Sequence, residues 1–277
     1  MKKNKLIAPF LKWVGGKRQL MPAIKELIPK NYTNYYEPFI GGGAVFFDLQ
    51  PKNAVINDFN AELINVYKTI KENPEELISD LKIHKNESEY FYDLRALDRE
   101  DNFENLSNIK KASRVIYLNK TCYNGLYRVN NSGEFNSPFG RYKNPNIVNE
   151  TTIRAVSKYL NTNKITILNG DFEDALKEIK KGSFVYFDPP YHPVSESSNF
   201  TGYVQGGFDI YEQVRLRDLC NKLNEIGINF LLSNSATQFI EDLYKDYKIS
   251  YVKANRSINS NAKKRGEIDE VLIRNYE

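Results

Sequence analysis

The chain has 277 residues, 41% of them hydrophobic, and a net charge of +4, so it can form a large core and its charge neither demands nor excludes a nucleic-acid partner. Its two cysteines, Cys122 and Cys220, lack metal or redox spacing, which argues against a zinc site and a disulfide-stapled secreted domain. The basic N-terminus lacks the apolar part of a signal peptide, and no apolar run approaches a membrane span. We therefore expect a cytoplasmic protein without a metal.

Basic residues are concentrated in two stretches. Residues 110–146 contain seven basic residues and one acidic residue, Glu134, while residues 253–265 contain five basic residues and no acidic one. On a near-neutral chain this indicates either a footprint for a polyanion or ordinary solvated surface. The 13% aromatic content, with 19 Tyr, is typical of surfaces that stack on bases.

The N-terminal part of the chain predicts the start of an α/β fold. The glycine turn Gly41-Gly42-Gly43 follows a strand, and Asn60 is a good cap for a helix through Tyr67. The other expected elements are a helix over residues 20–27, a strand over 35–39, a helix over 44–49 and a strand over 54–56. Residues 35–70 therefore predict a βαβ-like unit.

Residues 71–155 interrupt this pattern. Their first part is polar, charged and helical, whereas residues 122–146 are rich in Asn, Gly, Ser and Tyr and predict a hairpin with loops. The hairpin turn is expected at Asn130-Asn131-Ser132-Gly133. We interpret 71–155 as a subdomain inserted into one α/β domain that consists of residues 1–70 and 156–277.

The α/β pattern resumes after the insert. Residues 248–252 and 270–273 predict an antiparallel pair at the sheet edge, and a long irregular loop is expected over 192–207. The other expected elements are a strand over 165–168, a helix over 173–180, a strand over 183–187, a helix with Leu216, Leu219, Cys220, Leu223 and Ile226 on one face, a strand over 228–232 and a helix over 239–243.

The most informative motif is Asp188-Pro189-Pro190-Tyr191, which directly follows an apolar strand. Open α/β sheets bind ligands at the carboxyl ends of their strands. An amine on a base is a poor nucleophile, because its lone pair is delocalised into the ring. Asp188 and the carbonyl of Pro189 can each accept one N–H and localise that lone pair, while Tyr191 stacks on the base. The alternative is a strand that merely ends at a proline turn.

Three other strand ends carry residues that suit one ligand. The glycine turn allows close approach to the backbone at a helix N-terminus. Asp58 is placed to hold two ribose hydroxyls, and Asp171 with Phe172 can bind an adenine amine and cover its ring. Each acidic residue can instead cap a helix, but together, in this order, they predict an adenosine-containing cofactor next to Asp188.

The order of these motifs resembles that of Dam-type DNA adenine N6-methyltransferases, in which the cofactor motif precedes the recognition insert. The resemblance extends from Phe10 to the C-terminus. Its motifs are Phe10-Leu11-Lys12-Trp13-Val14-Gly15-Gly16-Lys17, Glu37-Pro38-Phe39-Ile40-Gly41-Gly42-Gly43, Ile56-Asn57-Asp58, Gly170-Asp171-Phe172, Asp188-Pro189-Pro190-Tyr191, Tyr123-Asn124-Gly125-Leu126-Tyr127-Arg128-Val129-Asn130 and Phe135-Asn136-Ser137-Pro138-Phe139-Gly140-Arg141-Tyr142-Lys143.

The resemblance implies an α/β protein with the class I S-adenosylmethionine-dependent methyltransferase fold. That fold has a mixed seven-stranded Rossmann-like sheet, here with an inserted helical and β-hairpin DNA-recognition subdomain. The implied reaction moves a methyl group from S-adenosyl-L-methionine to a flipped-out adenine, usually in double-stranded GATC. The enzyme is then bacterial or phage-encoded and acts as a monomer, and the sequence leaves open whether a partner endonuclease exists.

The resemblance also assigns roles to single residues. Catalysis falls to Asp188, Pro189 and Tyr191, and cofactor binding to Trp13, Lys17, Asp58, Asp171, Phe172 and Asp188. DNA contacts fall to Lys12 at the outer guanine, Tyr123 and Asn124 at the gap left by the flipped base, Arg128 at a guanine, Pro138 at a thymine methyl and Arg141 at a phosphate.

Less specific alternatives remain for some of these residues. Trp13 can be a core residue, Lys17 a solvated helix start, Tyr123 a packing residue of the hairpin and Arg128 a phosphate contact. Residues 255–266 are expected to form a loop that touches phosphates through Lys263, Lys264 and Arg265. Two other functions also remain: a methyltransferase for a different base, a different sequence or RNA, and a catalytically silent DNA-binding relative. The aspartate at the head of the motif favours adenine.

Overall fold

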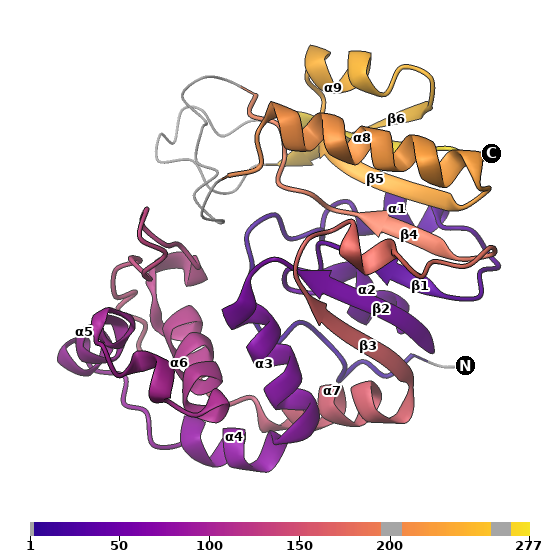
Figure 1. Cartoon of the computed structure of the whole chain (residues 1–277). Coiled ribbons are helices and arrows are strands. Elements are labelled where there is room, and N and C mark those ends of the chain that lie inside the picture. Colours follow the sequence, from indigo (N-terminus) through magenta and orange to yellow (C-terminus); the bar gives the residue numbers. More distant parts are fainter. Residues whose placement is uncertain (1–2, 195–206, 256–266) are drawn as a thin grey trace.

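A computed structural model describes residues 3–194, 207–255 and 267–277 (Figure 1). In these residues a single sheet has the strand order β3-β2-β1-β4-β5-β7-β6. The strands are β1 Tyr35–Glu37, β2 Asn53–Asp58, β3 Lys164–Asn169, β4 Phe184–Phe187, β5 Asn229–Ser235, β6 Lys248–Asn255 and β7 Glu267–Arg274. Strands β1 to β5 pair in parallel, and β7 lies antiparallel between β5 and β6. The expected mixed, Rossmann-like sheet of the class I fold is confirmed, although only β6 of the antiparallel pair is at the edge.

The helices also follow the expected order for the most part. They are α1 Met21–Leu27, α2 Ala44–Leu49, α3 Ala61–Glu72, α4 Pro74–Leu81, α5 Ser88–Ala96, α6 Asn108–Thr121, α7 Glu150–Thr162, α8 Ile210–Glu225 and α9 Gln238–Leu243. Asn60 caps α3, because its side chain accepts a hydrogen bond from the Leu63 N–H at 2.9 Å. Figure 1 shows α4, α5 and α6 grouped beside α3 and away from the strands.

The hairpin of the insert is present and its turn is confirmed. Val129 and Phe135 form an antiparallel bridge, as do Cys122 and Phe139. Between the arms, the Gly133 N–H donates to the Asn130 carbonyl at 3.0 Å, which closes the turn. The stretch is mostly irregular, and only isolated bridges join its arms.

Two local predictions are wrong. The helix expected over residues 173–180 is only a 3₁₀ turn, Asp174–Leu176. A 3₁₀ turn rises further per residue than an α-helix, which suits a short return from the end of β3 to the start of β4. Ile226 does not lie on the buried face of α8, because the helix ends at Glu225 and Ile226 is 56% exposed.

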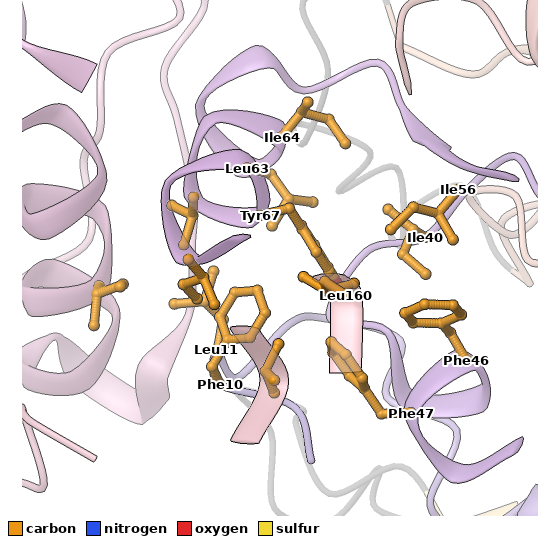
Figure 2. Packing of buried hydrophobic residues seen from close by; sticks show 14 of the residues in the cluster. Phe10, Leu11, Ile40, Phe46, Phe47, Ile56, Leu63, Ile64, Tyr67 and Leu160 are labelled. Carbon is orange, nitrogen blue, oxygen red and sulfur yellow. The ribbon is translucent and has the colours of Figure 1, made fainter. Parts of the chain in front are cut away.

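The core forms two clusters on the two faces of the sheet, and alternate strand residues separate into them. Tyr35 and Tyr186 belong to the first cluster, while Tyr36 and Phe187 belong to the second, as the two-residue period of a strand requires. Figure 2 shows part of the first cluster, in which residues from the N-terminal segment, α2, β2, α3 and α7 meet. The same cluster continues into the insert, so the insert shares its core with the sheet.

Replacing Gly43 with alanine is expected to destabilise the fold through a steric clash. Gly43 has a φ of +71°, and a Cβ there would lie 2.6 Å from the hydroxyl of Tyr67 and 2.8 Å from the ring of Phe47. Gly227→Ala is the matched control, because Gly227 also has a φ of +71° but nothing within 4 Å. We expect a loss of about 1 kcal/mol from the backbone at either position and a further ~1–3 kcal/mol at Gly43 alone. Urea denaturation measures both, and equal losses would contradict the clash.

Candidate active site

Four strands bring the predicted site together at one edge of the sheet. Strands β3, β2, β1 and β4 are neighbours and run in parallel, so their carboxyl ends lie side by side. These ends lead into Asp171, Asp58, the glycine turn and Asp188, respectively. The structure thus collects residues spread over most of the chain at the edge where open α/β sheets bind ligands.

Asp188 is paired with a buried lysine. The Lys17 ammonium lies 2.7 Å from Oδ1 of Asp188, and the two side chains are 5% and 21% exposed. Lys17 also donates to the Gly15 carbonyl at 2.6 Å, so the alternative of a solvated helix start is wrong. Burial raises the pKa of Asp188, while Lys17 and a hydrogen bond from Ser233 oppose that rise by stabilising the charged form.

Tyr191 is fixed at both its ring and its hydroxyl. The hydroxyl donates to Oε2 of Glu270 at 2.9 Å, and the Lys17 ammonium lies 4.6 Å from the ring centroid. One ammonium therefore contacts both the carboxylate and the ring of the motif. The cation over the ring also shows that Tyr191 can face positive charge with its π cloud.

Residues of β5 and α8 that the sequence analysis missed hold the backbone of the motif. Gln213 donates to the Pro190 carbonyl at 2.9 Å and accepts from Asn234 at 3.1 Å. Asn234 in turn accepts from the His192 N–H at 3.0 Å. The polar run 233–235, directly after the apolar part of β5, was the signal that could have revealed Asn234. Pro189 itself is buried.

A second carboxyl group lies beneath this site. Glu37, at the end of β1, is 2% exposed and accepts a 2.5 Å hydrogen bond from the hydroxyl of Tyr35. Burial holds the pKa of Glu37 well above its usual range, and the negative charge of Asp188 raises it further.

Asp58 is anchored beside the glycine turn. Its Oδ2 accepts from the Gly41 N–H and its Oδ1 from the Asn60 N–H, both at 2.9 Å. Tyr67 donates to the Gly41 carbonyl at 3.0 Å. Burial raises the pKa of Asp58 to about 6. Each carboxylate oxygen keeps a further lone pair, so Asp58 can accept from two adjacent hydroxyls of a ligand.

Asp171 and Phe172 are held by an arginine that the sequence analysis did not predict. Arg215 forms ion pairs with Asp171 and Glu173, and its guanidinium lies 4.3 Å from the centroid of the Phe172 ring. Phe39 stacks on Phe172 at 5.2 Å. Phe172 is therefore buried between a cation and a second ring, and Phe39 is the more exposed aromatic residue at this end of the edge.

Trp13 connects the glycine turn to the hairpin of the insert. Its ring stacks on Tyr127 at 4.7 Å, and a Cβ built on Gly41 would lie 3.0 Å from it. The hydroxyl of Tyr127 donates to Glu62 on α3 at 2.6 Å. Trp13 is thus partly a packing residue, which was the alternative to a role in cofactor binding. It also joins the glycine turn to the hairpin of the insert.

Four predicted DNA contacts lie together at the base of the hairpin. The side chain of Asn119 accepts from the Lys12 N–H at 2.9 Å and donates to the carbonyls of Lys12 and Gly125. Lys12 is thereby fixed next to the turn that carries Tyr123 and Asn124, and the Tyr123 N–H donates to the Pro138 carbonyl at 2.8 Å. The Tyr123 side chain is 58% exposed, which disfavours a purely packing role.

Arg128 and Arg141 lie elsewhere on the hairpin. Asn136 holds the guanidinium of Arg128, with Nε donating to its side-chain oxygen at 2.6 Å and Nη2 to its carbonyl at 3.2 Å. Nη1 makes no hydrogen bond or ion pair within the described residues. Arg141 is exposed and has a φ of +53°. Lys263, Lys264 and Arg265 lie outside the described residues.

Within the described ranges, no group of His, Cys, Asp and Glu side chains could hold a metal ion. The helices of that same part of the chain are too short or too polar to cross a bilayer.

Comparison with known proteins explains this arrangement. Residues 13–258 match the family model of D12 class N6 adenine-specific DNA methyltransferases. The chain belongs to this family. The resemblance seen in the motifs is thereby confirmed, and the protein is an adenine-specific DNA methyltransferase that uses S-adenosylmethionine.

Relatives that match over nearly their whole length are named as Type II methyltransferases or as DNA adenine methylases. The chain is 50% identical to the Type II methyltransferase M1.LlaDCHI of Lactococcus lactis subsp. cremoris, with 100% of this chain and 98% of that protein covered. It is 42% identical to the Type II methyltransferase M.MjaIII of Methanocaldococcus jannaschii, with 98% and 99% covered. It is 35% identical to the DNA adenine methylase of Serratia marcescens, with 98% of each covered.

Proposed function

We propose that this methyltransferase modifies the N6 of adenine in double-stranded GATC, that the base is flipped out of the duplex, and that the enzyme acts as a monomer. The observation that carries the proposal is the buried ion pair of Lys17 and Asp188 beside Tyr191, at the end of β4. A carboxylate that can accept a hydrogen bond from an amine lies there next to an aromatic ring, and both contact the same ammonium. A base inside a duplex cannot reach such a site, so it has to leave the stack.

Three groups of the motif act on the target base. Asp188 and the Pro189 carbonyl each accept one N–H of the amine, which localises its lone pair for attack on the methyl group. The ring of Tyr191 stacks on the base and stabilises the positive charge that develops on it. S-adenosylmethionine supplies the methyl group as an electrophile. The contribution of the protein is positioning and electrostatic stabilisation.

The strand ends fit this cofactor. Asp58 accepts from the ribose hydroxyls, and Trp13 and Lys17 contact the methionine part. The adenine binds at Asp171 and Phe172, where Phe39, which stacks on Phe172, is the more exposed ring. Support comes from the row of carboxylates at one edge, which suits a cofactor with a positively charged sulfonium. The glycine turn beside Asp58 allows a ligand to approach the backbone closely.

Cofactor affinity should rise with pH and level off near the pKa of Asp58, about 6. Hydroxyl donors favour the ionised carboxylate, so protonation of Asp58 opposes binding. Calorimetric titration with S-adenosylmethionine between about pH 5 and 7 measures this dependence. The Asp58→Asn variant should bind S-adenosylmethionine more weakly, and its affinity should not rise with pH in this range. An identical step in the variant would assign the titration to another group, such as Asp188 or Glu37.

We propose that residues 71–155 form the DNA target-recognition subdomain of a catalytic domain made of residues 1–70 and 156–277. Lys12, Tyr123, Asn124 and Pro138 support this because they meet at the base of the hairpin. Residues 110–146 of the insert are also locally basic, with seven basic residues and one acidic residue.

Arg128→Lys should relax discrimination at one guanine. With Nε held by Asn136, the outer end of the guanidinium remains for a bidentate contact with guanine O6 and N7, which a lysine cannot make. We expect a loss of discrimination of about 1–3 kcal/mol at that base pair. Arg141→Lys is the control, because a phosphate contact that keeps its charge should change discrimination little. Methylation rates on duplexes with single-base substitutions measure both, and equal effects would contradict the assignment.

The decisive experiment is methyl transfer from labelled S-adenosylmethionine to two duplexes that differ in one GATC site. N6-methyladenine only in the GATC duplex supports the proposal, whereas label in both duplexes overturns the recognition sequence. A single-stranded GATC oligonucleotide tests strand preference, and nucleoside analysis excludes methylated cytosine. Sedimentation of the enzyme bound to a duplex with one site measures how many enzyme molecules bind and so tests whether it acts as a monomer.

A further inference from the structure

We propose that Ser233 is a positioning residue for methyl transfer: together with Lys17 it holds Oδ1 of Asp188, so that Oδ2 is presented to the target amine. The inference rests on the proposed role of Asp188. Ser233 belongs to none of the motifs that the sequence analysis recognised, because it lies on β5, 45 residues after Asp188.

Two donors converge on the same oxygen of Asp188. The Lys17 ammonium lies 2.7 Å from Oδ1, and the Ser233 hydroxyl donates to Oδ1 at 3.0 Å. In the described residues no group donates to Oδ2, and Oδ2 is not among their buried unpaired side-chain atoms. The protein therefore uses one oxygen as an anchor and leaves the other accessible to a ligand.

A tyrosine sets the direction of the serine hydroxyl. The Tyr186 hydroxyl and the Ser233 oxygen lie 3.1 Å apart in the core. Ser233 has a single proton, and its two possible acceptors are Asp188 at 3.0 Å and the Phe187 carbonyl at 3.4 Å. The nearer, charged acceptor is the stronger one, so the proton goes to Asp188 and Tyr186 donates to Ser233. The result is a buried chain from Tyr186 through Ser233 to Asp188, in which each hydrogen bond polarises the next.

The sheet itself places Ser233. Strands β4 and β5 pair in parallel, with Phe187 beside Leu232. Asp188 directly follows Phe187 and Ser233 directly follows Leu232, so these two residues are neighbours. Ser233 is fully buried, which fixes its rotamer by packing. An ammonium alone is a weakly directional partner for a carboxylate. A second donor from a rigid strand fixes the plane of the carboxylate, which decides where Oδ2 points.

Ser233→Ala tests the inference in the full-length enzyme with S-adenosylmethionine and a GATC duplex. We expect the single-turnover rate to fall about tenfold, because the accepting oxygen is no longer held in the productive orientation, with both dissociation constants within about twofold of wild type. The acid limb of the pH–rate profile should move to higher pH, since the lost hydrogen bond stabilised the ionised carboxylate.

Matched variants separate positioning from general damage. Ser183→Ala removes a buried hydroxyl just before β4, at the opposite end of the strand from Asp188, and should leave rate and profile unchanged. Ser233→Thr keeps a donor and should restore the acid limb. If Ser233→Ala does not fold, Ser233→Cys, which nearly keeps the volume but donates weakly, gives the same comparison.

The outcomes distinguish this inference from the proposed function. An unchanged rate in Ser233→Ala, or a uniform loss at all pH values with the acid limb in place, would overturn the positioning role. Asp188→Asn tests the proposed role of Asp188 itself. If this variant retains turnover, that role is wrong, and the inference about Ser233 is wrong with it. If Asp188→Asn is inactive while Ser233→Ala behaves as wild type, only the role of Ser233 is lost.

Discussion

Replacing Asp188 with alanine is expected to reduce methyl transfer by at least about 10³-fold while leaving DNA affinity within a few-fold. The variant removes the carboxylate that we propose to accept the N–H of the target amine, and no other carboxylate of the described residues forms an ion pair with Lys17. The DNA contacts proposed for the insert lie on other elements and remain intact. Single-turnover methylation and DNA binding by fluorescence anisotropy measure the two effects separately.

A control is needed for the charge of Lys17, which loses its partner in Asp188→Ala. Without Asp188 the buried Lys17 keeps, among the described residues, the Gly15 carbonyl and the ring of Tyr191 as partners but no carboxylate, so cofactor binding can change in Asp188→Ala. Asp188→Asn keeps the size of the side chain and separates this effect from the loss of the acceptor. Asp48→Ala removes an aspartate that pairs with Lys3 and Lys25 far from the site, and should retain full activity. Turnover by both Asp188 variants would remove Asp188 from the mechanism.

The second large effect is a loss of stability when Arg114 is replaced. Arg114→Met should lower the free energy of unfolding by about 3–5 kcal/mol, because it removes a buried cation that pairs with both Asp98 and Glu62. The arginine is 1% exposed and lies 2.6 Å from Asp98 and 3.4 Å from Glu62. It also donates to the carbonyls of Leu94 and Arg95, both at 2.8 Å.

The loss of stability should spread to the hairpin of the insert. Glu62 accepts from Tyr127, and Asp98 accepts from the Phe135 N–H at 2.7 Å, so both partners of Arg114 also hold the hairpin. Arg154→Met is the matched control, since Arg154 pairs with Glu75 and Glu150 on the surface and should hardly shift the denaturation midpoint. Urea denaturation followed by circular dichroism compares the variants. Equal midpoints would show that the buried network does not stabilise the insert.

Local sequence determined much of the fold and the identity of the site. The strand ends at Asp58, Asp171 and Asp188 were predictable because an apolar strand followed by a polar residue is a short-range pattern. The glycine turn and the Asn60 cap were predictable for the same reason, since each depends on one residue and its immediate neighbours. Together with the order of the motifs, they indicated an adenine methyltransferase before any contact was known.

The partners of these residues depend on the order of the strands. Ser233 reaches Asp188 only because β5 pairs with β4, and Arg215 reaches Asp171 only because α8 packs near the end of β3. Neither pairing leaves a signal near the residues concerned. The 3₁₀ turn after Asp171 and the exposure of Ile226 likewise follow from how far a segment has to run and where a helix ends.

The sequence by itself therefore determined which chemical groups stand at the ends of the strands, because short-range periodicity and turn residues encode them. Tertiary structure alone decided that Lys17 is buried against Asp188, that Arg114 ties the hairpin to the core, and that one oxygen of the Asp188 carboxylate is anchored. The physical reason is that burial and ion pairing depend on which distant segments become neighbours, and the sheet order that settles this is a property of the whole chain.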